Sequence, residues 1–133
     1  MSRILVADDD PDQLVVSKIL LEAMGHEVVM AECPSEVLRE IERSAPALCM
    51  MDLRFSNGAG QPDSREGRAL IRRIREAGYR LPVVVLSGWP ADLYGEPEEA
   101  MVSRIMVKPV RIPELLETIA KLTSASAPSR NLP

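Results

Sequence analysis

The chain has 133 residues with 46% hydrophobic content, which is enough to build one globular domain around a single core. Its net charge of −4 argues against a general basic surface for nucleic acid or membrane lipid, and no apolar run approaches the about 20 residues of a membrane span. His26 is the only histidine, which excludes a histidine-based metal site and a Ser-His-Asp triad. Cys33 and Cys49 lack metal-ligand spacing, so we expect reduced thiols and a cytoplasmic location.

Short apolar runs alternate with amphipathic helical patterns along the chain. In chain order they predict a strand at 3–7, a helix from Pro11 to Gly25, a strand at 26–31, a helix at 33–45, a strand at 47–51, a helix at 64–78, a strand at 82–86, a strand at 103–107 and a helix at 113–122. The segment between the last two strands contains Pro90, Gly95 and Pro97, so we expect only about two helical turns there, from near Glu96.

Apolar strands separated by helices predict a parallel sheet that is covered on both faces. The fold class is therefore α/β, a five-stranded, flavodoxin-like, doubly wound (βα)5 three-layer sandwich with a weak fourth helix. We expect one domain over residues 1–122, with residues 123–133 as a flexible tail or the start of a linker. The long connection at 53–66 reads as a loop without regular structure, either functional or disordered.

Polar side chains stand where these strands end. They are Asp8 and Asp9 after the first strand, Asp52 after the third, Ser87 after the fourth, and Lys108 after the fifth. Ligands bind at the carboxyl ends of the strands in such sheets, so these groups should converge. Crowded carboxylates without histidine or cysteine favour Mg²⁺, and an aspartate can accept a phosphoryl group. A lysine and a serine nearby would hold its oxygens, so the site is suited to phosphorylating an aspartate.

The segments ILVADDDP, MMDL, VVVLSG and VKPV, in this order on the predicted strand ends, resemble the receiver domain of two-component response regulators. The resemblance covers residues 3 to about 122. It implies Asp52 as the phosphoacceptor and also as a Mg²⁺ ligand. The further metal ligands would be Asp9 directly, Asp8 largely through water, and the Arg54 backbone carbonyl. Ser87 and Lys108 would be partners of the phosphoryl group, and the Lys108–Pro109 bond would be cis.

The resemblance also implies partners. The donor would be a histidine kinase or a histidine phosphotransfer protein, a homodimer is one assembly that receivers adopt, and this domain would contact neither nucleic acid nor membrane directly. The domain would be a signalling phosphoacceptor that catalyses at most its own phosphorylation and dephosphorylation, rather than an enzyme.

Three departures from the family pattern stand out. The segment RFSN replaces the usual Met-Pro pair, and the loop there carries an insertion of about seven residues, with Gly67 as the best match to the family's glycine. Ile105 replaces the usual aromatic residue. Arg54 and Trp89 occupy the two positions that flank the phosphoryl group in the family, and a cation–π contact between them could shield the acyl phosphate from water.

Two alternatives remain open. A pseudo-receiver that signals without phosphate fits the inserted loop and Ile105, whereas the intact acidic residues, Ser87 and Lys108 argue against it. A haloacid-dehalogenase-type phosphatase would need a second aspartate where Arg54 stands. Simpler roles are expected for Asp10 as a helix cap and for Cys49 as a small buried apolar side chain. The arginines of the third helix, Arg65, Arg68, Arg72, Arg73 and Arg75, are expected to form a solvated face.

Overall fold

The computed structural model describes residues 2–130, and a parallel sheet of five strands lies at its centre. The strands are β1 (Arg3–Ala7), β2 (Glu27–Ala31), β3 (Leu48–Asp52), β6 (Val83–Ser87) and β7 (Arg104–Val107). Their order across the sheet is β2-β1-β3-β6-β7. This is the flavodoxin-like order that the sequence predicts, and each strand lies within one residue of its predicted bounds.

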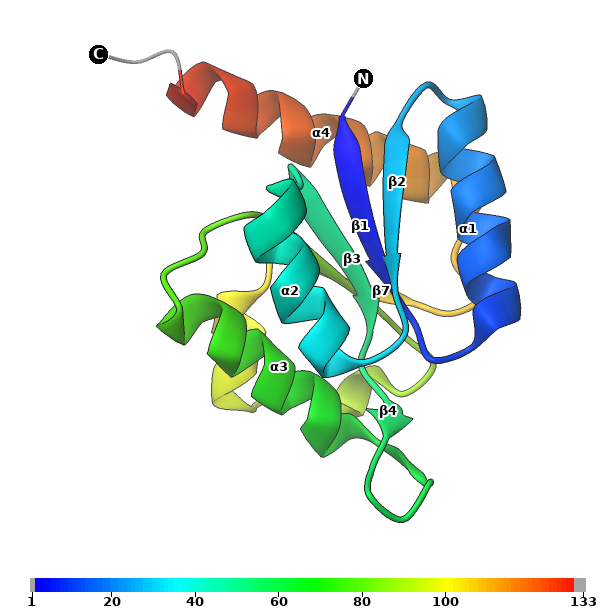
Figure 1. Ribbon diagram of the computed structural model, residues 1–133, viewed down its shortest axis with the longest axis vertical. Coiled ribbons are helices and arrows are strands. Elements are labelled where there is room, and N and C mark those ends of the chain that lie inside the picture. The colour runs from blue at the N-terminus through cyan, green and yellow to red at the C-terminus, as the bar shows by residue number, and fades with distance from the viewer. Residues whose placement is uncertain (1, 131–133) are drawn as a thin grey trace.

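Helices cover both faces of the sheet, as Figure 1 shows, with α2 (Pro34–Ser44) and α3 (Ser64–Glu76) together on one side and α4 (Ile112–Arg130) on the other. Successive strand residues point to opposite faces: Leu5 packs with α2 and α3, whereas Ile4 packs in the core formed by α1 (Pro11–Ala23) and α4. The sheet thus separates two apolar cores in a three-layer sandwich.

Local signals explain where α1 begins. Pro11 occupies the first turn, and the Asp10 carboxylate accepts a hydrogen bond from the Asp12 N–H at 3.0 Å. Asp10 is therefore the helix cap that the sequence predicts. The carboxylates of Asp8 and Asp9 at the strand end are therefore not needed as the helix cap.

The end of the chain differs from its prediction. The last helix was expected to stop at 122, yet α4 continues to Arg130, so residues 123–130 are helical and only 131–133 lie outside the described residues. The segment lacks glycine and contains two alanines, but it also contains Pro128 and three serines, so its composition does not explain the longer helix.

The connection 53–66 is the second difference, because it is not an irregular loop. Phe55–Ser56 (β4) and Pro62–Asp63 (β5) pair antiparallel as a short hairpin that projects from the sandwich. Leu53 and Phe55 on its first side are fully buried in the core that α2 and α3 cover. Burial of these two side chains anchors the insertion to the domain.

The weak fourth helix is two 3₁₀ segments, η1 (Pro90–Asp92) and η2 (Pro97–Met101). Prolines start both segments, and Gly95 between them has a positive φ of 83°. A continuous α-helix cannot form through such a sequence, so the chain uses shorter, tighter turns.

The arginines of α3 correct another expectation, because three of them bind the segment between β6 and β7 instead of facing only solvent. Arg72 Nη1 lies 2.8 Å from a carboxylate oxygen of the buried Glu98, and Arg68 Nη1 donates to the Asp92 carbonyl at 3.0 Å. Arg75 donates to the Met101 carbonyl through Nε at 2.9 Å and through Nη2 at 2.8 Å. These contacts attach the segment between β6 and β7 to α3, in place of the packing that a regular fourth helix would provide.

No helix within residues 2–130 is long and apolar enough to cross a membrane.

Candidate functional site

The strand register brings the predicted site residues to one edge of the sheet. Ala7 is paired with Met51, so Asp8 and Asp52 leave adjacent strands side by side. Ser87 is paired with Val107, which places Lys108 at the same level one strand further along. Parallel pairing alone therefore aligns two carboxylates, a hydroxyl and an ammonium.

Lys108 lies between the two carboxylates. Its Nζ is 3.1 Å from Asp52 Oδ2 and 4.0 Å from Asp8 Oδ2. The other Asp52 oxygen, Oδ1, accepts a hydrogen bond from the Arg54 N–H at 3.2 Å. The Lys108–Pro109 peptide bond is cis, as expected. Asp52 is thus held on both oxygens while its side chain stays 18% exposed, which leaves it accessible from solvent.

Asp8 is a carboxylate whose ionised form is disfavoured by its surroundings. Burial raises its pKa above the ordinary value, and the nearby Asp52 charge adds to this effect, while the Asp10 N–H and the Lys108 ammonium oppose it. Crowded carboxylates with too little positive charge are the condition that favours a bound cation.

Ser87 is buried at the end of β6, with 1% of its surface exposed. Its Oγ accepts a hydrogen bond from the Trp89 N–H at 2.9 Å, and its carbonyl accepts one from the Lys108 N–H at 2.9 Å. The hydroxyl hydrogen is therefore free to be donated elsewhere, and the chain on both sides of Ser87 is tied to neighbouring site residues.

Arg54 and Trp89 form the stacked pair that the sequence suggests, with the guanidinium carbon 3.8 Å from the ring centroid. Asp92 completes the group, since its Oδ2 accepts from Arg54 Nε at 2.9 Å and lies 2.8 Å from Nη2. Sequence reasoning missed Asp92, which lies 38 residues from Arg54 along the chain in a segment without regular periodicity. The carboxylate fixes the arginine over the indole beside the site.

Asp9 does not join the other two carboxylates. Its Oδ2 accepts hydrogen bonds from Ser56 in the hairpin, from the N–H at 3.1 Å and from the hydroxyl at 2.9 Å. Within residues 2–130, no three histidine, cysteine, aspartate or glutamate side chains gather closely enough to hold a metal ion. The donors are of the oxygen type that Mg²⁺ takes, but Asp9 is directed elsewhere.

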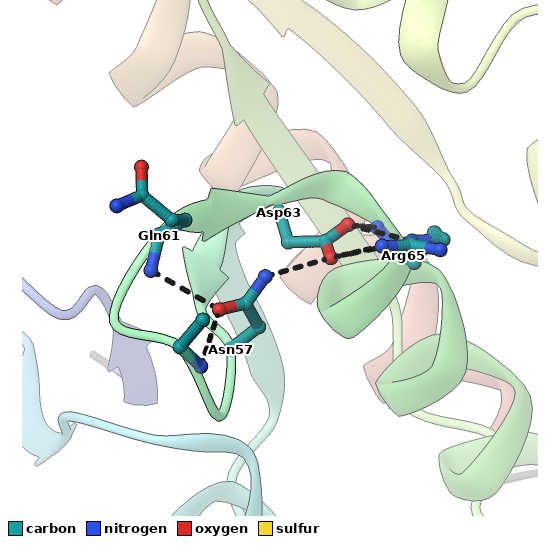
Figure 2. Close-up of polar contacts among 5 residues, drawn as sticks. Asn57, Gln61, Asp63 and Arg65 are labelled. Carbon is teal, nitrogen blue, oxygen red and sulfur yellow. Dashed lines mark hydrogen bonds and ion pairs between the residues drawn. The ribbon is translucent and has the colours of Figure 1, made fainter.

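The hairpin that carries Ser56 is organised by Asn57. The Asn57 side-chain oxygen accepts from the Ala59 N–H at 2.8 Å and the Gln61 N–H at 3.1 Å, and its nitrogen donates to Asp63 at 3.1 Å (Figure 2). Asp63 also accepts hydrogen bonds from the backbone and guanidinium of Arg65, which lower the pKa of its carboxyl. The turn is thereby joined to the first residues of α3.

Ile105 and Cys49 both lie in strands of the central sheet. Ile105 of β7 is partly buried and packs against the core beneath α2 and α3. Its aliphatic side chain thus fills the position where the family usually has an aromatic ring. Cys49 is a fully buried free thiol, and burial raises its pKa to about 12, so it is a packing residue rather than a nucleophile.

Comparison with known proteins places these features in context. The family model of the response regulator receiver domain matches residues 4–120. The chain is 29% identical over 130 residues to the transcriptional regulatory protein GlrR of Escherichia coli, covering 96% of this chain and 28% of GlrR. It is 36% identical over 86 residues to the autoinducer sensor kinase/phosphatase CqsS of Vibrio cholerae, covering 65% of this chain and 12% of CqsS. The chain therefore spans less than a third of either relative.

The fold has solved counterparts. The response regulator TrrA of Thermotoga maritima, crystallised in complex with Mg²⁺ and beryllium fluoride, superposes with a TM-score of 0.78 at 24% identity, over 92% of this chain and 99% of TrrA. At this identity the match concerns the fold.

Proposed function

The chain belongs to the response regulator receiver family, and on this basis we propose that Asp52 accepts a phosphoryl group from a phosphohistidine in a Mg²⁺-dependent reaction. As a member of this family it is a signalling domain of the phosphoacceptor class, not an ordinary enzyme. The single observation that carries the proposal is the placement of Asp52, with the Lys108 ammonium 3.1 Å from its Oδ2 at the carboxyl edge of the sheet.

The residues at this edge of the sheet can carry out the phosphoryl transfer. An Asp52 oxygen attacks phosphorus and the P–N bond of the donor phosphohistidine breaks. The electron pair of that bond stays on the imidazole nitrogen, which takes up a proton from solvent. Lys108 moves from the carboxylate to a phosphoryl oxygen, and the Ser87 hydroxyl donates to a second one. Both groups stabilise charge that is spread over the phosphoryl oxygens during transfer.

We assign the metal to Asp8, Asp9, Asp52 and the Arg54 carbonyl, because all four supply oxygen ligands at this edge of the sheet. Bound Mg²⁺ would neutralise the charge of the carboxylates and of the phosphoryl oxygens. TrrA, a structural neighbour, was crystallised with Mg²⁺ and beryllium fluoride, which supports this assignment. Asp9 must leave Ser56 to take part.

The donor is proposed to be a histidine kinase or a histidine phosphotransfer protein, and the relative CqsS, a sensor kinase/phosphatase, supports this class. Helix α1 begins directly after the acidic residues and exposes three large apolar side chains, Val15, Val16 and Ile19, each more than half exposed. Clustered apolar exposure of this kind suits a protein contact, so we place the donor here. If so, Ile19→Ser slows transfer from a phosphorylated donor protein and leaves phosphorylation by acetyl phosphate unchanged; equal effects on both would refute the placement.

The free thiols of Cys33 and Cys49 support a cytoplasmic setting.

The pseudo-receiver is the second candidate, favoured by one observation: Asp9 is bound by Ser56, away from the other carboxylates. Intact mass after incubation with acetyl phosphate and Mg²⁺ separates the two functions. The receiver gains one phosphoryl group that Asp52→Asn and a chelator both abolish. A wild-type protein that gains no mass would favour the pseudo-receiver.

A further inference from the structure

The contact between Ser56 and Asp9 joins the inserted hairpin to the metal ligands of the proposed site. Both the N–H and the hydroxyl of Ser56 donate to the same oxygen, Asp9 Oδ2, at 3.1 Å and 2.9 Å. Two donors on one carboxylate oxygen satisfy much of its hydrogen-bonding capacity and stabilise its negative charge. Ser56 therefore holds the Asp9 carboxylate away from the other carboxylates of the proposed site.

The hairpin that carries Ser56 is fixed by core packing and by hydrogen bonds. Phe55, its neighbour on β4, is 1% exposed in the core, and Ser56 itself is paired with Pro62 of β5. Asn57 closes the turn through its hydrogen bonds to two backbone N–H groups, and its bond to Asp63 joins the turn to the start of α3 (Figure 2). Because both ends of the hairpin are anchored, the pair of donors on Asp9 is a built feature and not the chance contact of a loop tip.

We propose that Ser56 is a positioning residue that withholds Asp9 from Mg²⁺ and so sets the metal concentration at which the site becomes competent. The inference rests on the proposed function and deepens it by naming the residue that regulates its metal. Mg²⁺ demands near-ideal geometry from its ligands, and within residues 2–130 Asp9 is not gathered with the other carboxylates, so it must turn toward them before it can bind the same ion directly. The hydrogen bonds lost in this rotation weaken metal binding by the free energy that they contributed.

The hydroxyl is the part of this contact that a substitution can remove. In Ser56→Ala the N–H donor remains, so Asp9 loses one of two charge-assisted hydrogen bonds, and its affinity for Mg²⁺ should rise by about 3- to 10-fold. Ser56→Thr retains a hydroxyl at the same atom and should keep the wild-type affinity. Gln61→Ala is the matched control, because Gln61 lies in the same hairpin and contributes its backbone N–H, not its side chain, to the turn.

The experiment is a titration of these proteins with Mg²⁺ in the absence of any phosphodonor. Trp89 is the only tryptophan of the chain and stacks on Arg54, so its fluorescence reports on the site, and calorimetry gives an independent dissociation constant. Circular dichroism confirms that each variant keeps the wild-type fold. We expect tighter binding for Ser56→Ala alone.

Two outcomes would overturn the inference, and they differ in what they say of the function. Equal or weaker Mg²⁺ binding by Ser56→Ala, with normal binding by the other proteins, means that Ser56 does not compete with the metal, while the phosphoacceptor function stands. No binding by any of the proteins at millimolar Mg²⁺ overturns both the inference and the metal dependence of the proposed function.

Discussion

Gly67 of α3 lies so close to the chain after β3 that any side chain there must disturb both elements. A Cβ on Gly67 would lie 2.1 Å from the Leu53 carbonyl oxygen, 2.8 Å from its carbonyl carbon and 2.9 Å from its Cα, whereas real Cβ atoms stay beyond 3.0 Å. In Gly67→Ala the helix must therefore move by about 1 Å away from a backbone that the buried Leu53 side chain holds in place.

The expected loss of stability follows from two opposing effects. Overpacking at a rigid contact costs about 1–3 kcal/mol, and alanine in place of glycine returns about 1 kcal/mol through helix propensity. Since the obstacle is main chain and not a flexible side chain, the cost lies at the upper end, and we expect a net loss of about 2 kcal/mol. Leu53 follows Asp52 directly, so the same shift should also slow phosphorylation by acetyl phosphate.

Urea denaturation followed by circular dichroism measures this loss. With typical slopes for a domain of this size, the midpoint should fall by about 1 M. Gly58→Ala is the control, because a Cβ on Gly58 meets nothing within 4 Å and its φ is not positive. If Gly67→Ala were as stable as Gly58→Ala, the packing of α3 against the site would be refuted.

Three further predictions concern the residues around the site. Arg54→Ala and Trp89→Ala should each shorten the lifetime of the aspartyl phosphate several-fold, measured by loss of phosphoprotein mass after removal of the donor, because the stacked pair shields the site. Asp8→Asn should raise the free energy of unfolding by about 1 kcal/mol at pH 7 in metal-free buffer. Because the raised pKa of Asp8 means that its charged form is disfavoured in the folded state, this gain should appear as pH rises above the ordinary value of 3.8 and vanish below it. Arg72→Ala should destabilise the fold by about 1–2 kcal/mol in urea denaturation, because the buried Glu98 loses an ion pair of 2.8 Å.

A specific experimental result would refute each of these three predictions. Arg73→Ala is the control for Arg72→Ala, since Arg73 is exposed on the same helix, and equal losses from both would show that the ion pair contributes nothing. A gain from Asp8→Asn that persists at acidic pH would mean that charge crowding is not its cause. Unchanged phosphate lifetimes in both Arg54→Ala and Trp89→Ala would end the shielding hypothesis.

The sheet and the position of the site could be predicted because they depend on local patterns. Runs such as Val83–Ser87 are apolar and β-branched, and they end where a charged or hydroxyl residue begins, so strand bounds and site residues emerge together. The order of alternating elements then fixes a parallel sheet, which brings Asp8, Asp52 and Lys108 to one edge. Even the contact between Arg54 and Trp89 followed from their spacing to the strand ends.

What could not be predicted depends on contacts between distant residues. The hairpin looks like a loop in sequence because its order comes from the side chain of Asn57 and from Ser56 meeting Asp9, 47 residues away. Arg72 looks solvated until the segment between β6 and β7 buries Glu98 beside it. In each case the fold brings together two polar side chains that are far apart in the sequence. Hydrophobic periodicity predicts helices and strands but not contacts of this kind.

The residue that carries the phosphoryl group can be identified chemically. Protein treated with acetyl phosphate and Mg²⁺ can be reduced with borohydride, which converts an aspartyl phosphate to homoserine, and the modified residue can be found by peptide mass spectrometry. If Asp52 is the phosphoacceptor, we expect homoserine at position 52 in the sample with Mg²⁺ and none in the sample with chelator. Homoserine at Asp8 or Asp9, or at no position, would contradict it.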